Sequence, residues 1–99
     1  MTTYRIVDIK HTGELGKAGD RRTDSASLGR IGRHVLIEKD DIMIGLSLFM
    51  PCTYAPGWDG DPYFKSLRTS PVSYVQENQL NKNLIVTTKN SHYELEPIE

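Results

Sequence analysis

The sequence predicts an all-β protein: a small single-domain barrel or bent sandwich of about six short strands, SH3-like or OB-like. Only three alanines stand against 21 β-branched residues, namely eight Thr, eight Ile and five Val. Alanine favours helices, whereas β-branched side chains suit the pleated surface of a sheet. Several stretches alternate apolar and polar residues, and turn residues recur about every 8–12 positions. Closure into a barrel is favoured because it removes exposed strand edges.

The first half of the chain contains three predicted strands. Residues 4–11 form the first, and residues 34–39 form the second, which precedes a turn at two aspartates. Residues 42–50 form the clearest strand, because apolar side chains occupy every even position. We expect this even face to point into the core. We also expect Pro51 to end the strand, since proline cannot donate to a β-ladder.

The second half contains the remaining strands. Residues 63–70 and 72–77 are two candidates, and Pro71 between them requires a break, a bulge or an edge position. Residues 84–89 and 92–95 form a hairpin around Asn90-Ser91, after a polar turn at residues 78–83. The side chains expected to be largely buried across the whole domain are Ile44, Leu46, Leu48, Val86, Tyr93 and Leu95.

Two loops are long for so small a domain. Residues 13–27 are rich in glycine and charge and have little to bury, so we expect this loop to be mobile. The loop at residues 51–62 carries Tyr54 and Trp58 among prolines and glycines. Tyr54 and Trp58 are therefore candidate residues of a protein-contact loop.

Composition limits the compartment and the partners. Cys52 is the only cysteine, so an internal disulfide is excluded, and an unpaired thiol suits a reducing compartment. The first ten residues lack the apolar run of a secretory signal, and the most apolar window is far shorter than a membrane span of about 20 residues. We therefore expect a cytoplasmic protein without a membrane partner. The net charge of −1 argues against attraction of the whole surface to nucleic acid or anionic lipid.

A local basic segment is nevertheless present. Between residues 17 and 34 the formal charge is +3, from five cations and two aspartates. Arginine offers a planar fork of donors that matches phosphate, so this segment is a candidate nucleic-acid surface. The alternative interpretation is a solvated loop whose cations are balanced by nearby acids. The candidate nucleic-acid-binding residues are Arg21, Arg22, Arg30, Arg33 and His34.

The sequence supports no catalytic, metal or cofactor assignment. His11, His34, His92 and Cys52 are not at the short spacings of structural zinc sites. The segment at residues 59–62, Asp-Gly-Asp-Pro, begins like a calcium loop but lacks the later ligands, and a turn is the better interpretation. We name no catalytic residue, and expect neither a metal nor a cofactor.

Part of the chain resembles known sequences. The run Arg-Thr-Ser-Pro-Val at residues 68–72 and the hairpin at residues 85–96 are similar to short bacterial proteins of unknown role, some carried on mobile elements. A weaker similarity covers residues 28–32. The resemblance implies a small β domain and transfers no functional residue.

Three functional hypotheses follow. The leading one is a non-enzymatic interaction module that binds a protein partner, or a second copy of itself, through a sheet edge or through the loop at Trp58. The second is a nucleic-acid-associated barrel that uses the basic segment, which steep salt dependence of binding would distinguish from the first. The third is a small-molecule binder or an enzyme with an enclosed pocket.

Overall fold

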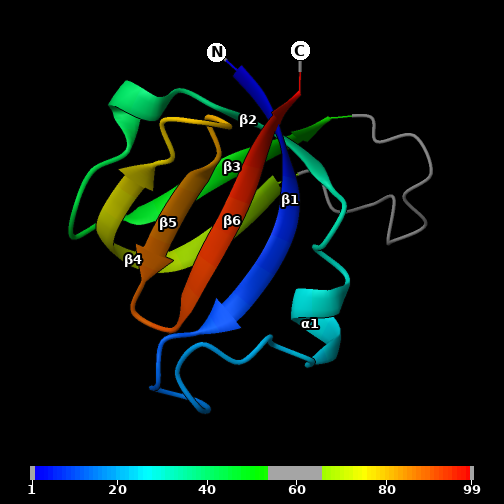
Figure 1. Ribbon diagram of the computed structural model, residues 1–99, viewed down its shortest axis with the longest axis vertical. Coiled ribbons are helices and arrows are strands. Elements are labelled where there is room, and N and C mark those ends of the chain that lie inside the picture. The colour runs from blue at the N-terminus through cyan, green and yellow to red at the C-terminus, as the bar shows by residue number, and fades with distance from the viewer. Residues whose placement is uncertain (1, 54–65, 99) are drawn as a thin grey trace.

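The computed structural model describes residues 2–53 and 66–98, which form a closed antiparallel barrel (Figure 1). Six strands follow one another around it in chain order, and β6 pairs with β1 to close it. The all-β prediction and the prediction of a small barrel are both confirmed. The strands are β1 (Thr2–His11), β2 (His34–Ile37), β3 (Ser47–Thr53), β4 (Ser66–Glu77), β5 (Leu84–Thr88) and β6 (Ser91–Ile98).

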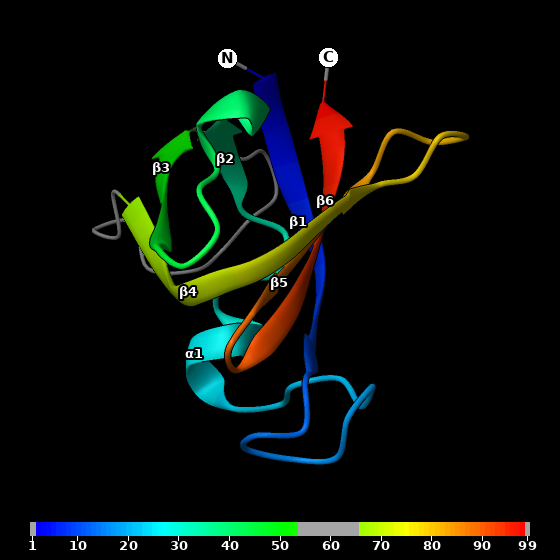
Figure 2. The same ribbon diagram turned by 90° about the vertical axis from the view of Figure 1, so that its left-hand side faces the viewer.

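Helical structure in the described part of the chain is limited to two short elements. Helix α1 (Ser25–Leu28) lies at the end of the barrel where β5 turns into β6, and the 3-10 helix η1 (Lys39–Asp41) follows β2 (Figure 2). None of the helices in residues 2–53 and 66–98 is long and apolar enough to cross a membrane.

The core fills the barrel with side chains from all six strands. In β5 and β6 the buried positions fall at every second residue, as the predicted hairpin requires. Val86, Tyr93 and Leu95 are buried as predicted. The buried apolar side chains are Tyr4, Ile6, Ile9, Val35, Ile37, Met50, Leu67, Val72, Leu84, Val86, Tyr93 and Leu95.

The predicted strand at residues 42–50 is wrong in its first half. The chain turns at Gly45, whose φ of 92° is a conformation that side chains with a Cβ rarely adopt. The Gly45 N–H donates to the Val72 carbonyl over 2.7 Å, and Leu46 accepts a hydrogen bond from the Val72 N–H over 2.9 Å. Ile44 and Leu46 are consequently 63% and 56% exposed rather than buried. Leu48 is half-buried against the core, and Met50 is fully buried.

Two prolines lie inside strands rather than at their ends. Pro51 does not terminate its strand, because β3 continues to Thr53 and Pro51 pairs with Ser66 of β4. Pro71 does not divide two strands, because β4 runs through it from Ser66 to Glu77. The register of β4 against β5 shifts just after Pro71, between Val72 and Tyr74, which is the bulge that was one of the predicted outcomes. The start of the predicted strand at residues 63–70 lies outside the described residues.

The loop at residues 13–27 folds back against β1. Its hydrogen bonds to that strand run from His11 N to the Asp20 carbonyl (2.8 Å), from Gly19 N to the His11 carbonyl (2.9 Å) and from Arg22 N to the Ile9 carbonyl (2.8 Å). These bonds direct Arg22 and α1 toward the end of the barrel. The mobility expected for this loop stays a prediction.

Candidate functional site

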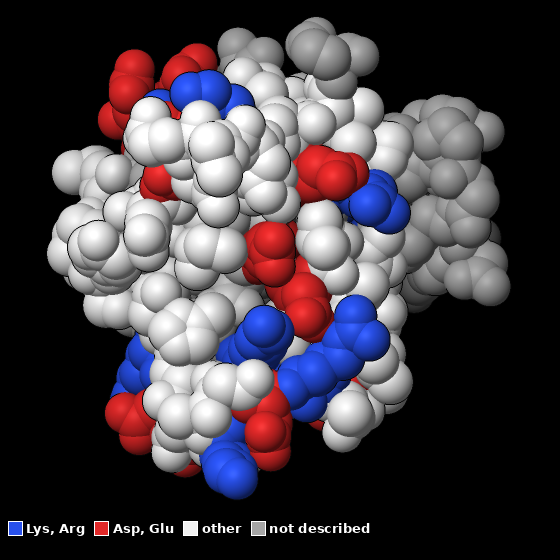
Figure 3. Space-filling view, viewed as in Figure 1, with Lys and Arg blue, Asp and Glu red and all other residues white. Residues whose placement is uncertain are grey.

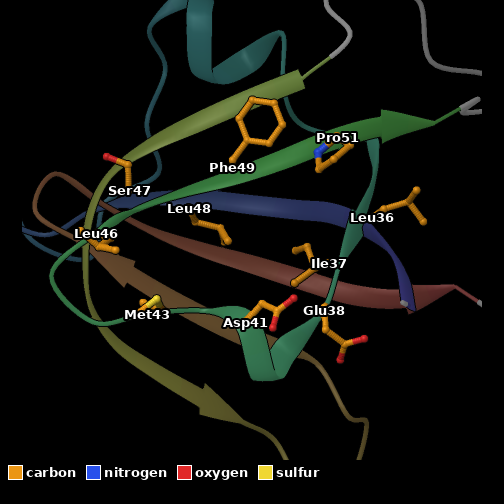
Figure 4. A pocket seen from close by; sticks show the side chains of 10 residues that line it. All are labelled: Leu36, Ile37, Glu38, Asp41, Met43, Leu46, Ser47, Leu48, Phe49 and Pro51. Carbon is orange, nitrogen blue, oxygen red and sulfur yellow. The ribbon is translucent and has the colours of Figure 1, made fainter.

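A groove opens between β2 and β3 and has a volume of about 300 Å³ (Figure 4). Figure 4 shows Ile37 and Leu48 between the ribbon of β3 and η1, with Glu38 at one end and Leu46 at the other. We call this the apolar groove. Its lining residues are Leu36, Ile37, Glu38, Asp41, Met43, Leu46, Ser47, Leu48, Phe49 and Pro51.

The apolar groove exists because β2 and β3 pair over only two positions. His34 pairs with Thr53 and Val35 pairs with Cys52, and the pairing stops before it reaches Pro51. Proline has no N–H to donate, so the β-ladder cannot continue regularly past it. Beyond this point β3 pairs only with β4 on its other side. The two strands therefore separate, and their facing edges border the groove.

Large apolar side chains surround the groove while remaining in solvent. Met43, Leu46 and Phe49 are 62%, 56% and 53% exposed, whereas Ile37 at the base is buried. The two hydrogen bonds from residues 45 and 46 to Val72 hold this rim against β4. Exposed apolar side chains gathered at one hollow are typical of a binding surface, whereas single scattered ones are ordinary.

One end of the groove is acidic. Glu38 and Asp41 line it, and both lie at the ends of η1. The nearest basic residue in sequence, Lys39, is engaged elsewhere, because its Nζ lies 3.2 Å from Oε1 of Glu77. Within residues 2–53 and 66–98, the Asp41 carboxylate has no hydrogen bond or ion pair. A cation on a ligand would find an unneutralised carboxylate there.

A second cavity, of about 210 Å³, lies between α1 and the turn that joins β5 to β6. Three arginines line it, and we call it the arginine pocket: Arg22 precedes α1, Arg30 follows α1, and Arg68 comes from β4. Asp24 is the only acidic residue among the described lining residues. The rest of the lining is largely polar and includes Ala26, Ser27, Ser70, Asn90, Ser91 and Tyr93.

The structure brings together only two of the five predicted nucleic-acid-binding residues. Arg22 and Arg30 both line the arginine pocket. Arg68 lines it as well, although it was not among the predicted residues. Arg21 points elsewhere and bonds Asp8, with 2.7 Å between Nε and Oδ1. Arg33 is buried, at 5% exposure, and His34 is half-buried in β2 opposite Thr53. The predicted contact residues Tyr54 and Trp58 and the segment at residues 59–62 lie outside the described part of the chain.

The visible charged surface is mixed rather than uniformly basic. Figure 3 shows Lys and Arg side chains at the lower end of this face, interleaved with Asp and Glu. Three arginines of the described residues are also paired with acids, in the ion pairs Arg21–Asp8, Arg22–Asp24 and Arg5–Glu96. A continuous basic track, which nucleic-acid backbones require, is not present on this face.

Asp24 fixes the geometry on one side of the arginine pocket. Its carboxylate accepts hydrogen bonds from Ser27 N (3.1 Å), from the Ser27 hydroxyl (3.0 Å) and from Arg22 Nε (2.9 Å). Burial alone would raise the pKa of Asp24. The hydrogen bonds outweigh burial, and the pKa lies below its ordinary value of 3.8.

This lowered pKa predicts a pH-dependent effect of replacing Asp24 with asparagine. A carboxyl with a lower pKa in the folded state stabilises the fold above its unfolded pKa, and this contribution is lost as the pH falls through the folded pKa. We expect Asp24→Asn to be less stable than the wild type at pH 7, with the difference shrinking as the pH falls from about 4 toward 2. Urea denaturation at several pH values measures this, and a difference independent of pH would contradict it.

Cys52, His92 and His11 each lie against identified neighbours. Burial raises the pKa of the Cys52 thiol, against the opposing effect of Arg33 and Arg30, so the protonated form is favoured. His92 Nδ1 lies 2.8 Å from the Thr87 hydroxyl, and the His11 ring packs against Gly16. No three His, Cys, Asp or Glu side chains in residues 2–53 and 66–98 gather as metal ligands would.

Fold and surface together define a small closed β-barrel with an apolar groove at an incompletely paired strand edge and a cationic pocket at one end. Comparisons with family models, curated proteins and solved structures found no match. The resemblance to short bacterial proteins therefore stays a prediction.

Proposed function

We propose that this protein is a non-enzymatic interaction module that binds an extended segment of a partner protein in the apolar groove. The observation that carries the proposal is the early end of the β2–β3 pairing, beside which Met43, Leu46 and Phe49 stay exposed. An extended segment can form main-chain hydrogen bonds along a strand edge while its alternate side chains enter apolar pockets.

The charges around the groove specify the partner further. The Asp41 carboxylate lines the groove without a hydrogen bond or ion pair within residues 2–53 and 66–98, and no basic residue is among the described lining members. An apolar segment with a lysine or arginine beside it would complement this surface, whereas an acidic segment would be repelled. The occupant is therefore an extended, apolar, positively flanked segment of another protein.

Nucleic acid is the less favoured partner for this groove. Phosphates would face Glu38 and Asp41, and aliphatic side chains such as Met43 and Leu46 offer no stacking platform for bases. A small-molecule reaction is also disfavoured, because the groove lining offers no nucleophile–base pair within the described residues.

The test is a selection from a phage-displayed library of heptapeptides against the full chain. Selected peptides should share alternating apolar residues and at least one lysine or arginine. The most enriched peptide, labelled and measured by fluorescence anisotropy, should bind Leu46→Asp at least tenfold more weakly, about 1.4 kcal/mol. Leu80→Asp is the matched control, because Leu80 is 95% exposed in the turn between β4 and β5, outside the groove.

Asp41→Lys tests the charge argument separately. It should weaken binding of the basic peptide and leave binding of a version with neutral flanks nearly unchanged. The proposal would be overturned by a library without enrichment, or by selected peptides that bind Leu46→Asp and Leu80→Asp equally well.

A further inference from the structure

The arginine pocket is a separate cavity from the apolar groove and has its own chemistry, although Arg68 of the pocket lies beside Phe49 of the groove lining. Arg22 and Arg30 flank α1, whereas Arg68 comes from the distant strand β4, and each arginine is held by a different neighbour. Arg22 Nη1 donates to the Ser91 hydroxyl over 2.8 Å, and Arg30 Nη1 donates to the Tyr93 hydroxyl over 2.7 Å. The Arg68 guanidinium lies 6.0 Å from the centre of the Phe49 ring. These contacts orient the arginines before any ligand arrives.

Much of the donor capacity of these arginines is unused. A guanidinium has five N–H donors, and within residues 2–53 and 66–98 Arg30 uses one of them, for Tyr93. Neither Arg30 nor Arg68 forms an ion pair with a described carboxylate; only Arg22 does, through Asp24. Unneutralised guanidinium groups at a polar cavity are the arrangement that binds oxyanions.

The charge of the pocket selects among oxyanions. Three arginines and one aspartate leave a formal charge of +2. A phosphate monoester carries a charge of about −1.5 to −2 at pH 7, whereas each phosphodiester of a nucleic acid carries only −1. Nucleic acid would also need further cations along its path, and the neighbouring Arg21 is already paired with Asp8.

We infer that the arginine pocket is a binding site for a small, polar phosphate monoester, with Arg22, Arg30 and Arg68 holding the phosphate. Ser70 and Asn90 also line the pocket and can bond hydroxyl groups on the organic part. Ser70 is itself held in place, because its hydroxyl donates to Thr88 over 2.8 Å and accepts from the Asn90 N–H over 3.2 Å. A phosphorylated sugar or hydroxy acid has this combination of groups.

The test is isothermal titration of the full chain with ribose 5-phosphate, inorganic phosphate and ribose as probes at low ionic strength. Ribose 5-phosphate should bind, inorganic phosphate should bind more weakly, and ribose should not bind. Arg30→Gln and Arg68→Gln should each weaken binding of ribose 5-phosphate at least tenfold. Arg21→Gln is the matched control: it removes an arginine of the same loop that lies outside the pocket, and should change the affinity less than twofold.

The pH dependence gives a second readout that loss of folding would not imitate. The second proton of a phosphate monoester dissociates near pH 6, so affinity for ribose 5-phosphate should fall about fourfold between pH 7.5 and 5.5. The charged groups facing the phosphate are the three arginines and Asp24, whose pKa is lowered, and no histidine is among the described lining residues. Sulfate keeps its charge throughout this range, and its binding should stay unchanged.

Competition by oligonucleotides distinguishes a phosphate monoester from nucleic acid as the ligand of the pocket. A ten-nucleotide single strand with a 5′-phosphate should compete with ribose 5-phosphate, and the same strand with a 5′-hydroxyl should not. Equal competition by both strands would indicate that the pocket binds a nucleic-acid backbone rather than a phosphate monoester, and would overturn the inference. Absence of binding at millimolar ribose 5-phosphate, or unchanged affinity in Arg68→Gln with a native circular dichroism spectrum, would overturn it as well.

Discussion

Replacing Leu95 with alanine should lower the free energy of unfolding by about 2–5 kcal/mol, because it leaves a cavity in a closed core. Leu95 is fully buried in β6, where it pairs with Ile6 of β1 on one side and Leu84 of β5 on the other. Both of these neighbours are also fully buried. Water therefore does not reach the space that the leucine leaves, and the cavity remains inside the core.

The matched substitution is Leu46→Ala. The even-position pattern of residues 42–50 predicts that Leu46 belongs to the core, and the structure leaves it 56% exposed at the rim of the apolar groove. Its replacement should change stability by less than about 0.5 kcal/mol. Urea denaturation of both variants measures the difference. Equal losses in the two variants would contradict the placement of Leu46 on the surface.

The fold was predictable where one face of a strand is buried. Alternation in the β5–β6 hairpin predicts Val86, Tyr93 and Leu95 as core residues, because a period of two separates the inside from the outside of a barrel. The same rule fails at residues 42–46. The even-position side chains there share no face: Ile42 packs against the core, whereas Ile44 and Leu46 are exposed. Gly45 in the middle of the run was the local sign of a turn.

The candidate sites were less predictable because the fold decides how their segments meet, and the arginine pocket joins segments that are far apart in the sequence. Arg22 and Arg30 stand out in the sequence as members of a basic cluster. Arg68 does not, since only the barrel brings β4 beside the segment that carries the other two. Pro51 is a comparable case: a proline predicts an interrupted ladder, but the fold decides that the interruption opens between β2 and β3.

The hydroxyl of Thr88 joins three elements of the barrel. It is nearly inaccessible, at 2% exposure of the residue, and its full hydrogen-bonding capacity is used. It donates to the Ser91 carbonyl (3.1 Å), accepts from the Ser91 N–H (3.2 Å) and accepts from the Ser70 hydroxyl (2.8 Å). Ser91 is also buried and receives the Arg22 hydrogen bond at the arginine pocket. The core hydroxyl is thereby connected to the pocket wall.

We expect Thr88→Val to destabilise the protein by about 2–6 kcal/mol, although valine has nearly the same shape. The substitution leaves the N–H and the carbonyl of Ser91 without this partner in a buried position, and each such group costs about 1–3 kcal/mol. Thr88→Ser is the control, since it keeps the hydroxyl and loses one methyl group, at about 0.8 kcal/mol. Chemical denaturation measures stability, and hydrogen exchange at the Ser91 amide reports the local bond. A loss in Thr88→Val no larger than that in Thr88→Ser would show that the hydroxyl network does not hold the β5–β6 turn.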